Sequence, residues 1–324
     1  MNRIWSPVVF GLAIAALASA TYMPRSQGSR GARLLQVAAP SALAPAARFD
    51  RSQSAALFVG VRKFTRDKTL DVPFAVDDAI DLAYVFALDP RVGLVPPERV
   101  VLALSGTPYK RESQRRLDEL ISAGAQLGPA EKNDILALLH QQAARAGRNG
   151  IFILALATHG FMSEGNSYVL GSSSLYRDPG TAISTEKMFD IVATTGAQRS
   201  LLFLDACRER ITGARPDPQT TAPALDRMTR VQGQVVFYAA TAGKWAYDGD
   251  GNGVFTKAVL DGLNCKGSSA HCIVTVESLR QYVEREVLAW IRGHRDPSIG
   301  AAIQVNLDGD THNMPLANCC PPSP

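Results

Sequence analysis

Two short segments carry side chains that could act together as a nucleophile and its base. His159 follows the apolar run 151–156, and Cys207 follows the apolar run 201–204. Runs of this length and composition predict buried strands. Parallel strands deliver the residues at their carboxyl ends to one edge of a sheet, so we expect the imidazole and the thiol to meet there. A neighbouring imidazole converts a thiol into a thiolate, and the pair therefore predicts nucleophilic chemistry at Cys207.

The segments around this pair alternate between strand and helix. Strands are predicted from continuous apolar runs and helices from apolar residues at helical spacing. The strands are expected at 55–61, 100–104, 151–156, 201–204 and 234–240, and the helices at 76–88, 129–146, 188–194, 254–263 and 276–291. This alternation predicts an α/β layered fold in which helices flank a mostly parallel central sheet.

The first twenty residues have the three parts of a secretory signal peptide. Arg3 provides the positive start, 8–18 is the apolar stretch, and Ala18-Ser19-Ala20 is a small-residue cleavage site. We therefore expect a secreted or periplasmic protein, with an uncleaved N-terminal anchor as the alternative. No later apolar run reaches the roughly 18 residues that a membrane span needs, so no span is expected after removal of the signal.

Composition excludes some partners and indicates which cysteine stays outside disulfides. The 324 residues carry a net charge of +4 without a basic stripe, so no nucleic-acid partner is expected. Five cysteines are an odd number, which leaves at least one outside intramolecular disulfides. Cys207 follows a buried strand, whereas the other four lie in glycine-, serine- or proline-rich stretches near the C-terminus. We expect Cys207 to remain a thiol; three pairings of the others, or five thiols, stay open.

As a set, four stretches of the chain resemble the caspase and metacaspase-like cysteine peptidases. The matching stretches, which together extend from Ser54 to Leu307, are the N-terminal strand with 75–79, Thr158-His159-Gly160, 203–208, and 236–241 continuing to 253–256. The gap of 48 residues between His159 and Cys207 is close to the caspase spacing of about 50. The resemblance implies a peptidase domain over 51–310, followed by a tail at 311–324. The preceding segment 21–50 is rich in Ala, Pro, Ser and Arg without periodicity and is expected to be a flexible linker or pro-segment.

The resemblance also implies roles for the residues of the pair. Cys207 would be the nucleophile and His159 the proton carrier, acting on protein or peptide substrates. The backbone amides of Gly160 and Cys207 would form the oxyanion hole. No third catalytic carboxylate is expected, because the family needs none. No metal site or cofactor is expected either, since the other histidines lack metal-ligand spacing.

Two aspartates predict which residue the enzyme would cleave after. Caspases that cut after aspartate carry Gln two residues before the cysteine, whereas metacaspase-like relatives carry Asp, as this chain does at Asp205. A carboxylate in the pocket attracts Arg or Lys at P1, and Asp78 stands where such relatives have a second pocket carboxylate. The structural alternatives are a solvated strand-end carboxylate for Asp205 and a helix N-cap for Asp78.

Some neighbouring features depart from the metacaspase pattern. Arg208-Glu209-Arg210 replaces the usual His-Ser-Gly, which leaves calcium activation in doubt, and 208–230 would be an irregular loop in which a basic-specific enzyme could cut itself. The segment 248–253 begins like an EF-hand loop, but Val259 occupies the position of the required Glu, so a polar turn is expected. Trp245 and Tyr247 are predicted either beside the substrate groove or in ordinary packing.

Together these features predict an exported cysteine endopeptidase that cleaves after Arg or Lys through Cys207 and His159. Two alternatives remain at this point. One is a catalytically silent caspase-like domain that serves as a binding or scaffold module. The other is an enzyme that uses the same two residues on a different acyl substrate.

Overall fold

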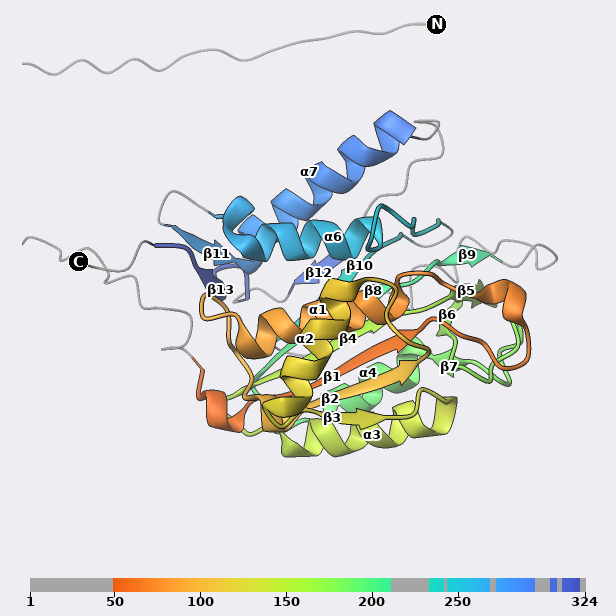
Figure 1. Ribbon diagram of the computed structural model, residues 1–324, viewed down its shortest axis with the longest axis horizontal. Coiled ribbons are helices and arrows are strands. Elements are labelled where there is room, and N and C mark those ends of the chain that lie inside the picture. The colour runs from red at the N-terminus through yellow and green to blue at the C-terminus, as the bar shows by residue number, and fades with distance from the viewer. Residues whose placement is uncertain are drawn as a thin grey trace, which may run out of the picture. The chain divides into compact units, whose positions relative to one another are not determined.

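The computed structural model describes residues 49–210, 233–241, 244–268, 272–294, 304–307 and 311–320. The strands of its main sheet are β1 (Ala55–Val61), β2 (Val100–Ser105), β3 (Gln126–Gly128), β4 (Ile151–Ala157), β8 (Arg199–Asp205), β10 (Gln234–Tyr238) and β12 (Gln304–Leu307). Their order is β12-β10-β8-β4-β1-β2-β3 (Figure 1). Among the described strands of this sheet, β12 is antiparallel to its neighbour and the others run parallel. The predicted α/β fold class is confirmed.

The register of the three central strands brings their carboxyl ends to one edge. Ala157 of β4 pairs with Gly60 of β1 on one side and with Asp205 of β8 on the other. His159 and Cys207 each follow two residues after these paired positions. The parallel pairing predicted from the two apolar runs therefore places both side chains at the same edge of the sheet.

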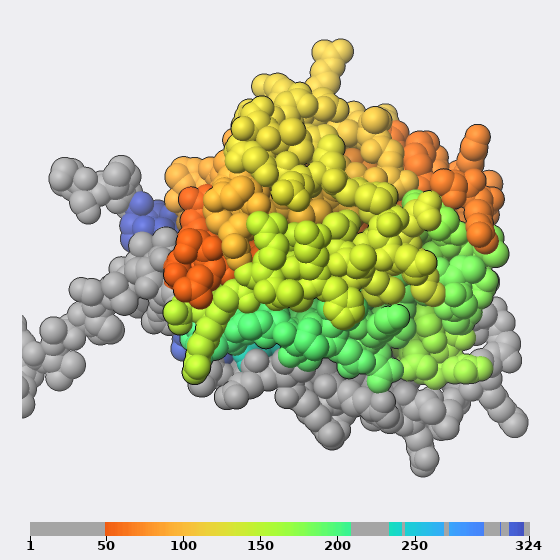
Figure 2. Space-filling model, turned by 90° about the horizontal axis from the view of Figure 1, so that it is seen from below, coloured from red at the N-terminus to blue at the C-terminus, as the bar shows by residue number. Residues whose placement is uncertain are grey.

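Helices cover both faces of the sheet. They are α1 (Ala75–Leu88), α2 (Arg111–Ser122), α3 (Lys132–Arg145), α4 (Thr185–Ala193), α6 (Val254–Asp261) and α7 (Val276–His294). Helices α1, α6 and α7 lie on one face, with α2 packed on α1, and α3 and α4 lie on the other (Figure 1). Figure 2 looks onto the face that α3 and α4 cover in yellow-green and green. No helix in the described ranges has the length and apolar character required to cross a bilayer.

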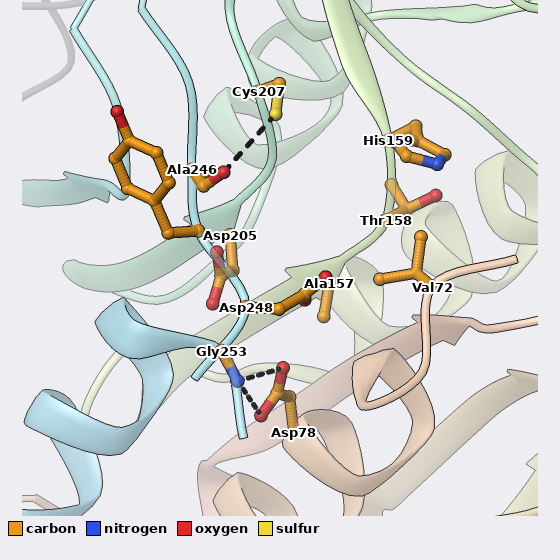
Figure 3. A pocket seen from close by; sticks show the side chains of 11 residues that line it. Val72, Asp78, Ala157, Thr158, His159, Asp205, Cys207, Ala246, Asp248 and Gly253 are labelled. Carbon is orange, nitrogen blue, oxygen red and sulfur yellow. Dashed lines mark hydrogen bonds between the residues drawn. The ribbon is translucent and has the colours of Figure 1, made fainter. Parts of the chain in front are cut away.

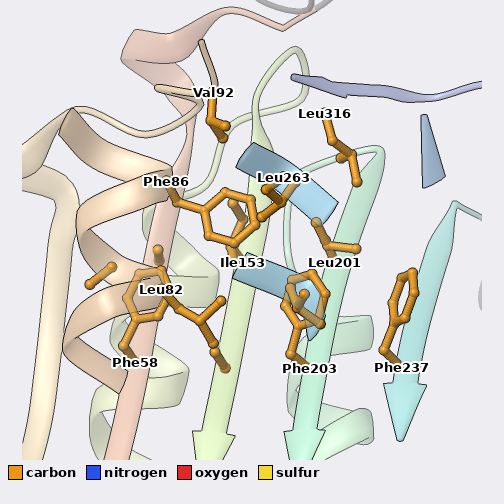
Figure 4. Packing of buried hydrophobic residues seen from close by; sticks show 14 of the residues in the cluster. Phe58, Leu82, Phe86, Val92, Ile153, Leu201, Phe203, Phe237, Leu263 and Leu316 are labelled. Carbon is orange, nitrogen blue, oxygen red and sulfur yellow. The ribbon is translucent and has the colours of Figure 1, made fainter. Parts of the chain in front are cut away.

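Alternating strand residues build a separate core on each face. Phe58, Phe203 and Phe237 lie on the face that α1, α6 and α7 cover, and Phe86 of α1 packs 6.2 Å from Phe58 and 5.8 Å from Phe203, measured between ring centroids (Figure 4). Their neighbours in the strands, such as Leu57, pack on the opposite face. Because both faces are covered, the strands are apolar throughout, which is why they could be predicted from composition.

Several elements differ from the sequence prediction. Pro129 does not open α3, which begins at Lys132, and the helix expected at 188–194 is α4, which begins at Thr185. Helix α2 was not predicted; its residues are mostly charged or polar, and it buries only Ser113 and Leu120. A helix of this kind depends on its neighbours, here α1, for its stability.

A small second sheet lies beside the edge that carries His159 and Cys207. Its strands are β5 (Gly160–Ser163), β6 (Asn166–Val169), β7 (Ile183–Ser184) and β9 (Glu209–Arg210), in the order β7-β6-β5-β9. Because β5 follows His159 and β9 follows Cys207, their parallel pairing holds the two segments together beyond the main sheet. The loop expected at 208–230 thus begins with a short strand; 211–232, including most of the predicted self-cleavage segment, lies outside the described residues.

The C-terminal segment 311–320 is part of the folded unit rather than the expected tail. Strand β13 (Pro315–Asn318) pairs with β11 (Ile273–Thr275), and Leu316 is fully buried. Disulfides join Cys265 to Cys319 and Cys272 to Cys320. Cys207 takes part in neither bond and remains a thiol, as the cysteine arithmetic predicts.

Candidate active site

A cavity of about 90 Å³ opens at the carboxyl ends of β4 and β8 (Figure 3). Side chains from distant parts of the chain meet in it. The described lining comprises Val72, Asp78, Ala157, Thr158, His159, Asp205, Cys207, Ala246, Tyr247, Asp248 and Gly253. Cys207 and His159 stand at one end of the view in Figure 3, and Asp78 lies at the other end beside Gly253. The structure therefore places all the side chains predicted for catalysis and substrate binding around one space.

The imidazole of His159 is oriented by a backbone carbonyl. Its Nε2 atom lies 2.7 Å from the carbonyl oxygen of Leu70, in the segment that leads from β1 to α1. A carbonyl can only accept, so Nε2 carries the hydrogen and Nδ1 is left as the basic nitrogen. Phe64 and Tyr176 flank the ring at centroid distances of 5.6 and 5.8 Å. The role of Leu70 was not predicted, because every residue has a backbone carbonyl and the residue type does not indicate which carbonyl contacts the imidazole.

The thiol of Cys207 donates a hydrogen bond to the carbonyl of Ala246, with 3.7 Å between sulfur and oxygen (Figure 3). The next residue, Arg208, is buried and anchors this corner. Its backbone amide donates to the carbonyl of Lys244 at 2.9 Å, and its guanidinium lies 4.6 Å from the ring centroid of Tyr238. These contacts fix the backbone on which the thiol is mounted.

Gly160 lies where two backbone segments come together. A Cβ at this position would stand 2.4 Å from the carbonyl oxygen of Cys207 and 2.9 Å from that of Tyr168. No side chain can be accommodated at such distances, so the close approach requires glycine. The backbones of the predicted oxyanion-hole residues, Gly160 and Cys207, are therefore immediate neighbours.

The carboxylate of Asp205 forms part of the cavity wall. Its Oδ2 atom accepts hydrogen bonds from the backbone nitrogen and the hydroxyl of Thr256, at 3.3 and 2.6 Å. Burial raises the pKa of Asp205 to about 6; the Thr256 hydroxyl opposes the rise and the charge of Asp248 adds to it. The alternative of a freely solvated strand-end carboxylate therefore does not describe this residue.

Asp78 is held inside the protein by the turn that precedes α6. It accepts a hydrogen bond of 2.8 Å from the Asn252 amide and bonds of 3.1 and 3.2 Å from the backbone nitrogen of Gly253. Burial raises its pKa well above the ordinary value, and the charge of Asp205 raises it further. The N-cap of α1 is Phe74, so the alternative role of Asp78 as a helix cap is wrong.

Gly253 lies between the two predicted substrate-binding carboxylates. A Cβ at this position would stand 2.6 Å from Oδ2 of Asp205 and 3.1 Å from Oδ2 of Asp78. Any side chain here would displace one of these carboxylates. The glycine thus allows aspartates from β8 and α1 to share one wall of the cavity.

The segment 244–253 contributes Ala246, Tyr247, Asp248 and Gly253 to the cavity lining, of which only Tyr247 was predicted as a possible neighbour of the substrate groove. It forms the expected polar turn, in which Asp248 bridges to Gly253 and the Gly249 nitrogen donates to the Asn252 carbonyl at 3.0 Å. Tyr247 lines the cavity and also packs against Trp290 at 5.6 Å between ring centroids, so the two predicted roles combine in one residue. Trp245 is 48% exposed and is not among the described lining residues.

Asp248 is the most exposed of the described carboxylates around the cavity. Desolvation raises its pKa, and the nearby imidazole of His159 opposes that rise. Because it also acts on the pKa of Asp205, its carboxylate lies within electrostatic reach of both ends of the cavity. A lone aspartate in a polar turn gave no signal in the sequence that it would reach this cavity.

Comparisons with known proteins agree with this architecture. A family model described as the caspase domain of Peptidase_C14 matches residues 54–305. The structure of protein GSU0716 from Geobacter sulfurreducens is similar, with a TM-score of 0.50 and 14% identity over 81% of this chain and 97% of that one. Caspase-1 from Spodoptera frugiperda has a TM-score of 0.46 and 12% identity over 79% of this chain and 88% of that one. No curated protein matches.

Proposed function

This chain belongs to the caspase-domain family of peptidases, and we propose that it is a cysteine endopeptidase that cleaves after arginine or lysine. One observation carries the proposal: a thiol, an imidazole and a strand-end carboxylate line the same cavity at the edge of the parallel sheet. The thiol and the imidazole supply a nucleophile and its base. The carboxylate of Asp205 supplies a partner for a positively charged side chain.

The geometry of the site suggests the course of the reaction. The sulfur of Cys207 turns from the Ala246 carbonyl, its proton passes to Nδ1 of His159, and the thiolate attacks the peptide carbonyl carbon. The backbone amides of Gly160 and Cys207 hold the negative oxygen of the tetrahedral intermediate. The imidazolium then protonates the leaving amine as the C–N bond breaks, and water hydrolyses the acyl-enzyme.

The charge of the cavity supports a basic P1 residue. Asp78, Asp205 and Asp248 contribute carboxylates, and no lysine or arginine is among the described residues that line the cavity. A P1 aspartate would bring another negative charge into this partly desolvated space, whereas a guanidinium or ammonium group would be attracted.

Export is part of the proposal and has its own support. Disulfides such as Cys265–Cys319 persist in oxidising compartments, which include the bacterial periplasm and the extracellular space. The signal-like sequence at 1–20 lies outside the described residues. We expect mature protein in a secreted or periplasmic fraction, beginning after Ala20. Edman sequencing of that fraction tests this, and recovery of full-length chain only in membranes would indicate the anchor instead.

The proposed activity is tested with a matched set of fluorogenic peptides that differ only at P1. Arg and Lys peptides should be cleaved and Asp and Gln peptides should not, and Cys207→Ala should remove all cleavage. Faster hydrolysis of the P1-Asp peptide would contradict the assigned specificity. Labelling of Cys207 by an uncharged alkylating reagent, without cleavage of any peptide, would favour the scaffold module or a different acyl substrate.

A further inference from the structure

The carboxylate of Asp248 takes no part in the reaction steps above. Asp248 is carried by the bridged turn 248–253, which also places Gly253 between Asp78 and Asp205. The preceding residues Ala246 and Tyr247 line the same cavity. Asp248 is therefore mounted on a segment whose position is fixed relative to the thiol and to the predicted P1 carboxylates.

The imidazole of His159 does not need Asp248 to orient it. Its Nε2–H group is already directed to the Leu70 carbonyl at 2.7 Å, which leaves Nδ1 for proton exchange with the thiol. A carboxylate bound to Nδ1 would compete with that exchange. Asp248 is thus better suited to a group that enters the cavity from outside.

The other carboxylates are partly engaged by the protein itself. Asp78 accepts hydrogen bonds from Asn252 and from the Gly253 backbone, and Thr256 holds Oδ2 of Asp205 from two directions. A cation that enters the cavity can therefore contact Asp205 in the wall and Asp248, which is more exposed to solvent than Asp205. Two carboxylates from different segments, β8 and the turn 248–253, suit a guanidinium, which has five N–H donors in a planar fork, better than the compact ammonium of lysine.

We propose that Asp248 is a specificity-determining residue that binds the P1 side chain together with Asp205 and makes the site prefer arginine to lysine. This inference rests on the proposed peptidase function. Asp205 alone accounts for a basic P1 residue of either kind, whereas Asp248 supplies the second acceptor that distinguishes the two.

The test is Asp248→Asn compared with Asp250→Asn. Asp250 is exposed on the same turn and lines the groove between α6 and α7 instead of this cavity, so its substitution removes the same charge from nearly the same place. For both variants, kcat/KM is measured with P1-Arg and P1-Lys peptides at fixed ionic strength. The rate of Cys207 alkylation by iodoacetamide is measured against pH, and Asp248→Glu tests rescue by a retained carboxylate.

Asp248→Asn should lower kcat/KM for P1-Arg about tenfold, as expected for loss of a charge-assisted hydrogen bond, and for P1-Lys by less. Asp250→Asn should leave both values and their ratio nearly unchanged, and Asp248→Glu should retain most of the preference. The alkylation profile should match wild type in Asp250→Asn and Asp248→Glu, and in Asp248→Asn it should shift only slightly, because His159 loses one nearby negative charge.

Equal effects of Asp248→Asn and Asp250→Asn would overturn the inference, because the turn would then act only through its net charge. An equal loss for both peptides with a shifted alkylation profile would also overturn it, and would place Asp248 on the imidazole. If the wild-type protein cleaved neither peptide, the proposed peptidase function itself would be wrong. That result differs from a failure of the Asp248 inference, which requires an active wild-type enzyme and an unchanged ratio of the two kcat/KM values in Asp248→Asn.

Discussion

The two ends of the cavity are held in place by different kinds of group. At the reactive end, the partners of His159 and Cys207 are the backbone carbonyls of Leu70 and Ala246. At the binding end, the carboxylate of Asp78 is held by an amide side chain and a backbone nitrogen, and that of Asp205 by a hydroxyl and a backbone nitrogen. Carbonyls orient the reactive groups without adding charge. The carboxylates carry the charge that would select a substrate, so the two ends should respond differently to mutation.

The largest effect is expected at the reactive end. Cys207→Ala should lower kcat for the P1-Arg peptide by at least about 10⁴-fold, because the nucleophile is lost. Its midpoint of thermal unfolding should stay close to wild type, since the thiol takes part in neither disulfide. Steady-state kinetics and calorimetry measure the two quantities. Residual cleavage above that level would mean that another group is the nucleophile.

A smaller and selective loss is expected at the binding end. Asp205→Asn should lower kcat/KM for P1-Arg by about 100-fold, the scale for removing one partner of a desolvated charge pair. The isosteric amide should leave the rate of Cys207 alkylation by iodoacetamide unchanged, because the thiol and imidazole keep their partners. A parallel fall in alkylation would show that the two ends are not independent.

Gly253 sets the packing of the two carboxylates at the binding end. Gly253→Ala should lower kcat/KM for P1-Arg about tenfold, because the added methyl stands 2.6 Å from Oδ2 of Asp205 and must displace it. Gly293→Ala in α7 is the matched control, since a Cβ there meets nothing within 4 Å. The control should retain full activity. Full activity of Gly253→Ala as well would mean that Asp205 does not need its observed position.

The smallest effect concerns pH. The pKa of Asp205 is raised to about 6, so part of the population carries a proton near neutral pH and must lose it to bind a cation. KM for the P1-Arg peptide should therefore fall several-fold as pH rises from about 5 to 7. Asp78, Asp248 and His159 also face the cavity and broaden the transition.

Asp205→Asn isolates the contribution of that carboxyl to the pH profile. The fall in KM between pH 5 and 7 should be reduced in this variant, while the pH dependence of Cys207 alkylation should be retained. An unchanged KM profile would assign the titration to another of the cavity's ionisable groups.

The predictable strands of the main sheet share one property, which is burial on both faces. Strands β4 and β8 are apolar throughout because helices cover both sides, and that composition revealed them in the sequence. Helix α2 buries only two side chains and β9 is two residues long, so neither produced a recognisable pattern. The segment 311–320 was expected as a tail because its packing depends on β11 and two disulfides, whose pairing cannot be read from spacing.

The candidate site also contains residues that could be predicted from the sequence and groups that could not. His159 and Cys207 were predicted from their positions after two strands, and Gly160, Asp205 and Asp78 from the family resemblance. The structure places the side chains of His159, Cys207, Asp205 and Asp78 around one cavity, with the backbone of Gly160 beside that of Cys207. The carbonyls that hold the reactive pair were not predictable, because every residue has one. Asp248 was missed because a polar turn is full of such residues, and only its position beside the cavity distinguishes it.

The sequence by itself determined the order of the elements, the thiol and imidazole at two strand ends, and the cysteine left outside the disulfides. Each of these follows from local composition, periodicity or parity. Tertiary structure decided which distant groups meet, because contact depends on how the chain closes. Asp78 meets the backbone of Gly253 across 175 positions, with no Cβ between Asp78 and Asp205. Folding brought aspartates from separate segments into the wall of the cavity that also holds the thiol and the imidazole.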